Sequence, residues 1–146
     1  MSALALLSED DVRDPRDVSP PPPPVERPRR LEWADEIATR LVAFLDLEPN
    51  WDSFGAVPPR WEAVEAAYEL LMLISDPTTP TPQVVPTTTG GVQLEWHQSG
   101  IDLEVEVNSA FRFSVLYENS STGELREEEL VADLTPLRAW VRRLSE

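Results

Sequence analysis

Hydrophobic and polar residues alternate most regularly in two neighbouring stretches, 92–98 and 101–107. A period of two is typical of half-buried β-strands, because successive side chains point to opposite faces of a sheet. Ser99-Gly100 separates the stretches and suits a two-residue turn with positive φ. The pattern therefore predicts a β-hairpin with a fixed register. Its cross-strand pairs are Trp96 with Leu103 and Leu94 with Val105 on the apolar face, and His97 with Asp102, Glu95 with Glu104 and Gln93 with Glu106 on the polar face.

Three other segments carry hydrophobic residues at helical spacing, three and four positions apart. The first runs from Leu31 to about Leu47 and ends before Pro49. The second begins at Pro58-Pro59, which a helix tolerates in its first turn, and runs to about Ser75. The third, Leu137 to Leu144, follows a typical helix start at 133–136. We expect three amphipathic helices.

The strand that follows the hairpin is predicted from Phe111 to Tyr117, where apolar and polar residues alternate again. We expect a loop at 108–110 and Val107 opposite Phe111. This register places Arg112 across from Glu106, on the polar face of the sheet.

Two weaker strand signals border these three strands. Residues 83–86 end in a proline, which confines them to a sheet edge, and residues 124–131 are polar enough for the other edge. The predicted fold class is α+β: an antiparallel sheet of four to five strands with two N-terminal helices and one C-terminal helix packed on one face. The predicted core comprises Ile37, Leu41, Phe44, Trp61, Val64, Leu71, Leu94, Trp96, Leu103, Val105, Phe111, Phe113, Val115 and Trp140.

Residues 1–29 differ in composition from the rest of the chain. They combine an acidic cluster at 9–17 with five consecutive prolines, Pro20 to Pro24. Such a segment cannot bury enough apolar surface to fold, so we predict a disordered proline-rich acidic tail at 1–29 and a single α+β domain at 30–146. The proline run is a stiff spacer or, alternatively, a ligand for an aromatic groove. The apolar run at 3–7 is a candidate docking anchor.

Charge narrows the classes of partner. The chain has 27 acidic and 12 basic residues, no lysine, and a formal net charge of -15. Direct binding to nucleic acid or to an anionic membrane is disfavoured, because both need clustered cations. A basic protein partner is compatible with this charge, and solubility is the alternative explanation. The absence of cysteine and of a signal peptide leads us to expect a cytoplasmic protein.

The polar face of the hairpin is the first candidate site. Carboxylates directly opposite each other repel by about 0.2–1 kcal/mol, so the Glu95–Glu104 pair suggests a cation between them, either an arginine or a metal. The metal interpretation uses Glu95, His97, Asp102 and Glu104 as ligands. Alternatively, this is an ordinary solvated face on which Arg112 shares the charge and His97 pairs with Asp102.

The loop around Trp51-Asp52 is the second candidate site. Exposed aromatic residues beside a carboxylate suit a peptide or another ligand. In the alternative that we favour, Trp51 and Phe54 cap the core where two helices meet, and Asn50 or Asp52 hydrogen-bonds the backbone of the turn.

Two segments also carry a family resemblance: NWDSFGAVPP at 50–59 and, after a helix, PTTTGGVQLEWHQSGIDLEVEV at 86–107. They resemble an uncharacterised family of short acidic bacterial and phage proteins that share an NWD-x-x-GA-x-P element and a GGVQLEW strand. The resemblance covers about residues 48–107. It implies no activity, so it assigns no role to any residue.

Common catalytic motifs are absent from the sequence, and with no lysine, no cysteine and one histidine we predict no catalytic residues and no cofactor. The leading hypothesis is a small acidic cytoplasmic protein-binding module that neutralises a basic protein partner, in the manner of an antitoxin or immunity protein. The alternative is a metal-dependent enzyme or metal-binding domain that uses the acidic hairpin face. The oligomeric state is left open. The candidate partner-binding residues are Trp51, Asp52, Glu95, Asp102, Glu104 and Glu106.

Overall fold

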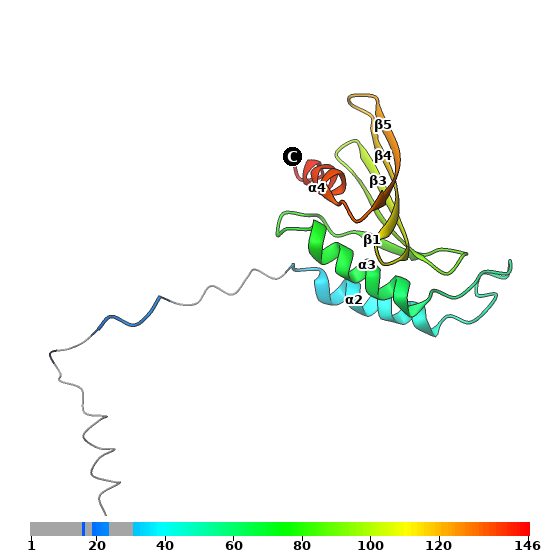
Figure 1. Ribbon diagram of the computed structural model, residues 1–146, viewed down its shortest axis with the longest axis horizontal. Helices are drawn as coiled ribbons and strands as arrows, with labels where there is room; N and C mark the ends of the chain where they lie inside the picture. The colour runs from blue at the N-terminus through cyan, green and yellow to red at the C-terminus, as the bar shows by residue number, and fades with distance from the viewer. Residues whose placement is uncertain (1–15, 17–18, 24–30) are drawn as a thin grey trace, which may run out of the picture.

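The computed structural model describes Arg16 and the ranges 19–23 and 31–146 (Figure 1). These residues form an α+β fold with a five-stranded antiparallel sheet and three α-helices. The elements are, in chain order, α2 (Ala34–Ala43), the 3-10 helix η1 (Phe44–Asp46), α3 (Trp61–Ile74), β1 (Gln83–Pro86), β2 (Val92–Gln98), β3 (Ile101–Ser109), β4 (Arg112–Asn119), β5 (Glu124–Val131) and α4 (Thr135–Arg143). The predicted tail, 1–29, lies outside the described residues apart from Arg16 and 19–23. None of the helices in the described part of the chain has the length and apolarity needed to cross a membrane.

The strands lie side by side in chain order, from β1 at one edge to β5 at the other. Both edge strands are therefore where the sequence predicts them. The β2–β3 hairpin has the predicted register, with Trp96 opposite Leu103. Its turn is formed by Ser99 and Gly100, whose φ angles of 56° and 72° lie in the left-handed region that a tight two-residue turn requires.

The register of β3 with β4 differs from the prediction by two residues. Val107 pairs with Phe113 and not with Phe111. β3 continues beyond Val107 with a register shift typical of a β-bulge, and Phe111 occupies the turn with φ 73°. The expected position of Arg112 opposite Glu106 is therefore wrong. Because the predicted and observed registers differ by an even number of residues, the apolar residues of both strands still share one face.

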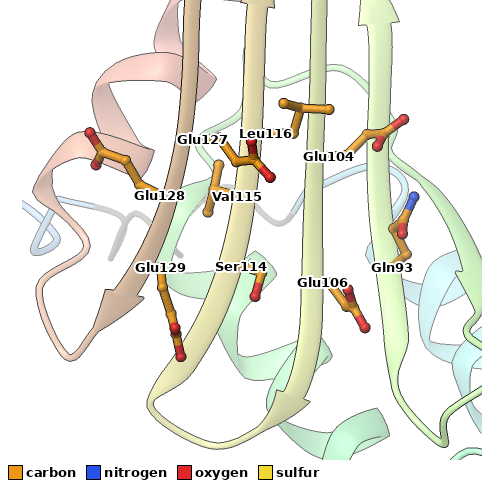
Figure 2. Close-up of a pocket in the computed structure, with 9 residues that line it drawn as sticks. All are labelled: Gln93, Glu104, Glu106, Ser114, Val115, Leu116, Glu127, Glu128 and Glu129. Carbon is orange, nitrogen blue, oxygen red and sulfur yellow. The ribbon is translucent and has the colours of Figure 1, made fainter.

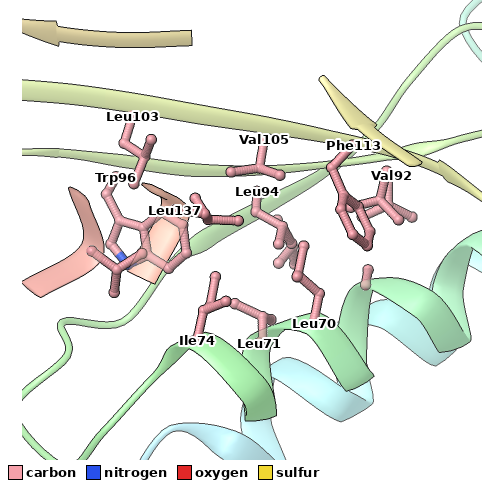
Figure 3. Packing of buried hydrophobic residues seen from close by; sticks show 14 of the residues in the cluster. Leu70, Leu71, Ile74, Val92, Leu94, Trp96, Leu103, Val105, Phe113 and Leu137 are labelled. Atoms are coloured by element: carbon pink, nitrogen blue, oxygen red, sulfur yellow. The ribbon is translucent and has the colours of Figure 1, made fainter. Parts of the chain in front are cut away.

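A single cluster of buried hydrophobic side chains contains residues from the sheet and from every α-helix of the described chain. Leu71 of α3 lies opposite Leu94 and Val105 of the sheet (Figure 3). α2 and α4 contribute to the same cluster through Ile37 and Leu137. Each fully buried side chain of this kind stabilises the fold by about 1.5–3 kcal/mol, so this cluster is the main source of stability.

Two buried indoles fix the connection between α3 and β1. Trp33 Nε1 donates to the carbonyl oxygen of Thr79 at 3.0 Å, and Trp96 Nε1 donates to that of Pro80 at 2.9 Å. Thr79 is itself buried. Trp33 was not among the predicted core residues, because it precedes the helical stripe from which the core was predicted.

Three predicted core residues are not buried. Trp61 is 59% exposed and Phe111 is 72% exposed, while Phe44 is partly buried at the border of the core. Trp61, the first residue of α3, shares one side of the helix with the exposed Glu65 and the partly buried Tyr68, four and seven positions later. Phe111 is exposed because it occupies a turn. Tyr117, which the predicted core lacks, is fully buried.

Candidate functional site

The acidic surface of the hairpin continues onto β4 and β5. Side chains of paired residues in neighbouring antiparallel strands point to the same face of the sheet. Asp102 of β3 pairs with Glu118 of β4, and Leu116 of β4 pairs with Glu127 of β5. We name this surface the acidic sheet face. Its carboxylates are those of Glu95, Asp102, Glu104, Glu106, Glu118, Glu127 and Glu129.

A hollow of ≈ 360 Å³ lies on the acidic sheet face (Figure 2). Leu116 lies on β4, which has Glu104 and Glu106 of β3 on one side and Glu127 and Glu129 of β5 on the other. A half-buried leucine among four carboxylates suits an arginine or lysine side chain. The aliphatic part of such a side chain packs on the leucine, while its charged end hydrogen-bonds the carboxylates.

Arg112 lies on the same face, at the end of β4. Its Nε is 3.7 Å from Glu129 Oε1, and both side chains are exposed. Exposed ion pairs of this kind contribute about 0–1 kcal/mol. Because β4 is shifted relative to the prediction, Arg112 does not lie opposite Glu106, and its ion pair is with Glu129 of β5.

His97 joins the carboxylates of the hairpin. Its Nδ1 is 2.7 Å from Asp102 Oδ1, as the ion-pair interpretation predicted, and its Nε2 is 3.3 Å from Glu95 Oε2. The hydrogen bond to Asp102, followed by that to Glu95, raises the pKa of His97 above its ordinary value of 6.5, because both favour the charged imidazolium. The protonated ring thus places a positive charge beside the Glu95–Glu104 pair. The repulsion between these two glutamates led us to predict a cation here, either an arginine or a metal.

Three of the four predicted metal ligands come together. One ligand atom each from Glu95, His97 and Glu104 lies within 4.8 Å of the others. Asp102 instead contacts Nδ1 of the imidazole. A carboxylate commonly orients a metal-binding histidine in this way, through the ring nitrogen that does not bind the metal.

The Trp51-Asp52 loop is held together by its own side chains. Asp52 Oδ1 accepts hydrogen bonds from two backbone N–H groups of the loop, at 2.8 and 3.0 Å, and Asn50 Oδ1 accepts a third at 2.7 Å. Trp51 Nε1 donates to the carbonyl oxygen of Val57 at 3.1 Å. These contacts match the structural interpretation of the loop. Neither Trp51 nor Asp52 lines the hollow on the acidic sheet face.

Phe54 contradicts the expectation that both aromatic residues of this loop cap the core. It is 92% exposed, whereas Trp51 is partly buried. The hydrogen bonds of the loop fix positive φ angles at Ser53 and Gly55, 67° and 84°, on either side of Phe54. The backbone therefore turns tightly at this point and leaves the ring in solvent.

The two segments that carry the family resemblance contact each other. The backbone N–H of Val57 donates to Thr88 O at 2.8 Å, and that of Arg60, directly after the first segment, donates to Gly90 O at 2.9 Å. The Arg60 guanidinium also donates to Asn108 O at 3.0 Å, so it links this loop to the end of β3. No protein-family model, curated protein or solved structure matches this chain.

Our sequence reasoning missed Glu118, Glu127 and Glu129 as site residues. They join the hairpin carboxylates only through the registers of β4 with β3 and with β5. A usable signal was present in the sequence, because the polar run NSSTG at 119–123 is typical of a turn, and such a turn pairs the two strands on either side of it. Pairing outward from that turn brings Glu127 opposite Leu116.

Proposed function

We propose that the chain is a small acidic cytoplasmic protein-binding module that captures a basic protein partner, in the manner of an antitoxin or immunity protein that neutralises its target. The observation that carries this proposal is the hollow on the acidic sheet face, where Leu116 lies among Glu104, Glu106, Glu127 and Glu129. The net charge of -15 supports it, because a charge of this size attracts a basic protein over long range.

The proposal requires an open acidic sheet face. We infer that α2, α3 and α4 all pack on the opposite, apolar face of the sheet. This inference is supported by the buried cluster, to which each of these helices contributes. It is also supported by the exposure of Glu118, Glu127 and Glu129 to solvent.

Arginine is the partner residue that fits this face best. Its planar guanidinium forms paired hydrogen bonds with carboxylates, and its stem packs on apolar surface. We place the contact on Glu104 and Glu106, which line the hollow, with Glu95 and Asp102 beside them on the same face, and not on the Trp51-Asp52 loop, which lies outside the hollow.

Affinity capture from cells that naturally contain the chain tests this proposal. We expect a basic protein that the unaltered chain retains to be lost with Glu104→Arg combined with Glu106→Arg. The control is Glu32→Arg combined with Glu48→Arg, which changes the net charge equally at exposed positions outside the sheet. Equal retention by both double variants would contradict a binding site on the acidic sheet face.

A second candidate function, a metal-binding domain or metal-dependent enzyme, is favoured by the clustered ligand atoms of Glu95, His97 and Glu104, with Asp102 behind the imidazole. A mixed set of one imidazole and two carboxylates suits Mn²⁺ or Zn²⁺ better than Mg²⁺. Affinity is expected to fall as the pH drops through the pKa of His97, because the ligating imidazole must be neutral.

Calorimetric titration with Mg²⁺, Mn²⁺ and Zn²⁺ tests the metal site. Glu95→Ala or Glu104→Ala should abolish binding, and Asp102→Asn should weaken it by about 10–100-fold, as loss of an orienting carboxylate does. Glu118→Gln is the control on the same face. Absence of binding at millimolar metal would remove this candidate.

A further inference from the structure

An apolar groove of ≈ 300 Å³ lies between α2 and α3. Leu41 and Val64, both buried, line its inner part. Val42 and Trp61, each 59% exposed, and Leu45 line its outer part. Large apolar side chains clustered in solvent are uncommon on monomeric proteins and mark interaction surfaces.

Exposed large hydrophobic residues concentrate at this end of the two helices. In the described part of the chain, five of the nine such residues fall between residues 42 and 61. Figure 1 shows the loop that joins α2–η1 to α3 at this same end of the molecule, and it carries Phe54 and Val57. The groove therefore lies near the end of the helices from which this loop extends.

Acidic residues border the groove on both helices. Residues three, four or seven positions apart share one stripe of a helix. On α3 this stripe carries Glu62, Glu65 and Glu69, and Glu65 lines the groove. On the other side, the exposed Asp35 lies seven residues before Val42, a groove residue, and the exposed Asp46 of η1 directly follows Leu45, which also lines the groove.

α3 contains no arginine, and the guanidinium of Arg60, just before it, donates to the carbonyl oxygens of Thr89 and Asn108. Arg40 of α2 pairs with Glu36 at 2.9 Å. Glu36 and Arg40 lie on the side of α2 away from Ala38 and Val42. The groove thus has an apolar interior and an acidic border.

We propose that this groove binds an amphipathic α-helix of a basic protein, with apolar residues at i, i+3, i+4 and i+7 in the groove and arginine or lysine against the acidic border. The acidic border of the groove favours a basic helix over two other occupants, a second copy of the chain and the chain's own N-terminal segment. A second copy of the chain would bring two acidic borders together. The chain's own apolar run at 3–7 is followed by Glu9, Asp10 and Asp11, which the border repels.

This inference rests on the proposed function to the extent that both invoke a basic partner, but it concerns a different surface. The direct test is calorimetric titration of the full chain with a synthetic peptide of about 14 residues, roughly 21 Å as a helix. The peptide carries leucine at the helical spacing above and arginine at the flanking positions. We expect saturable binding that Val42→Asp weakens by at least about 10-fold, since it places an unpaired charge in the groove.

Leu125→Asp on β5 is the matched control, because Leu125 is 60% exposed and lies outside the groove. We expect the peptide to bind this variant like the unaltered chain. The proposal is overturned if the peptide shows no saturable binding at millimolar concentration. It is also overturned if a scrambled peptide of the same composition binds equally well, or if Val42→Asp has no effect.

Two further variants separate this proposal from its rivals. If Glu104→Arg with Glu106→Arg abolishes peptide binding while Val42→Asp does not, the peptide occupies the acidic sheet face: the groove proposal fails and the proposed function stands. If the peptide binds the groove but no basic protein depends on Glu104 and Glu106, the proposed function fails and the groove stands. Two outcomes would assign the groove to the chain itself and overturn the proposal. One is a dimer, seen in sedimentation, that Val42→Asp dissociates. The other is a peptide affinity that rises about 10-fold in the double variant Leu4→Ser with Leu7→Ser.

Discussion

His97 is the one histidine of the chain, so a single imidazole titration reports on the acidic sheet face. The hydrogen bond to Asp102 is the largest cause of its raised pKa. We expect the NMR titration midpoint of His97 to lie above 6.5 and to move down toward 6.5 in Asp102→Asn. Asp35→Asn, on α2, should leave it unchanged. A midpoint at or below 6.5 in the unaltered chain would show that the Asp102 contact does not persist in solution.

The raised pKa of His97 also makes the stability of the fold depend on pH. Because the pKa of His97 is higher in the folded state than in the unfolded chain, its interactions stabilise the fold fully below the unfolded value of 6.5. This contribution is lost as the pH rises through the folded-state pKa. In Asp102→Asn the free energy of unfolding should vary less with pH across this window.

Gly91, in the second of the two resemblance segments, is required for steric reasons. A Cβ at this position would lie 2.8 Å from the backbone oxygen of Val107 and 2.5 Å from Asn108 Oδ1. We expect Gly91→Ala to lower the free energy of unfolding by about 1–3 kcal/mol, as overpacking does, measured by urea denaturation. Asn108→Ala in the same chain should restore only part of this loss, because the contact with the Val107 backbone remains. Full restoration would show that the side chain alone is responsible.

Helix α4 is attached to the sheet by an aromatic pair. The rings of Tyr117 and Trp140 stack with centroids 5.3 Å apart, and Arg143 Nη1 donates to the Tyr117 hydroxyl at 3.0 Å and to Glu124 Oε2 at 3.0 Å. We expect Trp140→Ala to cost about 3–5 kcal/mol in urea denaturation. Trp61→Ala, the same substitution at an exposed tryptophan, should cost less than about 1 kcal/mol. Comparable losses would mean that Trp61 packs more closely than its exposure indicates.

The elements of this fold differ in how well the sequence predicts them. The β2–β3 register follows from Ser99-Gly100, because a two-residue turn leaves one pairing compatible with the alternation of side chains. The β3–β4 register was predicted wrongly by two residues, because Phe111 continues the apolar alternation but lies in the turn. A bulge after Val107 has no clear signature in a single sequence.

Both surfaces proposed for binding depend on contacts between distant segments, and this limits what the sequence reveals of them. The hairpin carboxylates were predicted from local alternation, whereas Glu127 and Glu129 join them through β4. Helical periodicity wrongly assigns Trp61 to the core. It identifies the apolar stripe of α3, but it does not show where the packed part of that stripe ends. The groove between α2 and α3 is thus a property of the assembled molecule.

The predicted division of the molecule into tail and domain has a direct test. Among the described residues, the hydrophobic cluster begins at Leu31 and Trp33. We therefore expect deletion of residues 1–28 to leave the thermal unfolding midpoint nearly unchanged in calorimetry. A proline run does not pair in a sheet, because proline lacks the N–H that a strand ladder needs. A large drop in the midpoint would show that residues 1–28 contribute to the fold.

The net charge and the position of the charges make separable contributions to partner binding. Exposed charges act over about 8 Å at physiological salt and about 3 Å at 1 M, so the association rate constant should fall as salt rises. Glu104→Arg with Glu106→Arg and the control Glu32→Arg with Glu48→Arg each raise the formal net charge by four. At about 0.01 M salt, where exposed charges act over about 30 Å, both should therefore slow association in surface plasmon resonance. Only the first should also accelerate dissociation, because contacts within the complex, and not the overall field, determine how long it lasts. If both double variants accelerate dissociation equally, or if neither does, the partner does not bind the acidic sheet face.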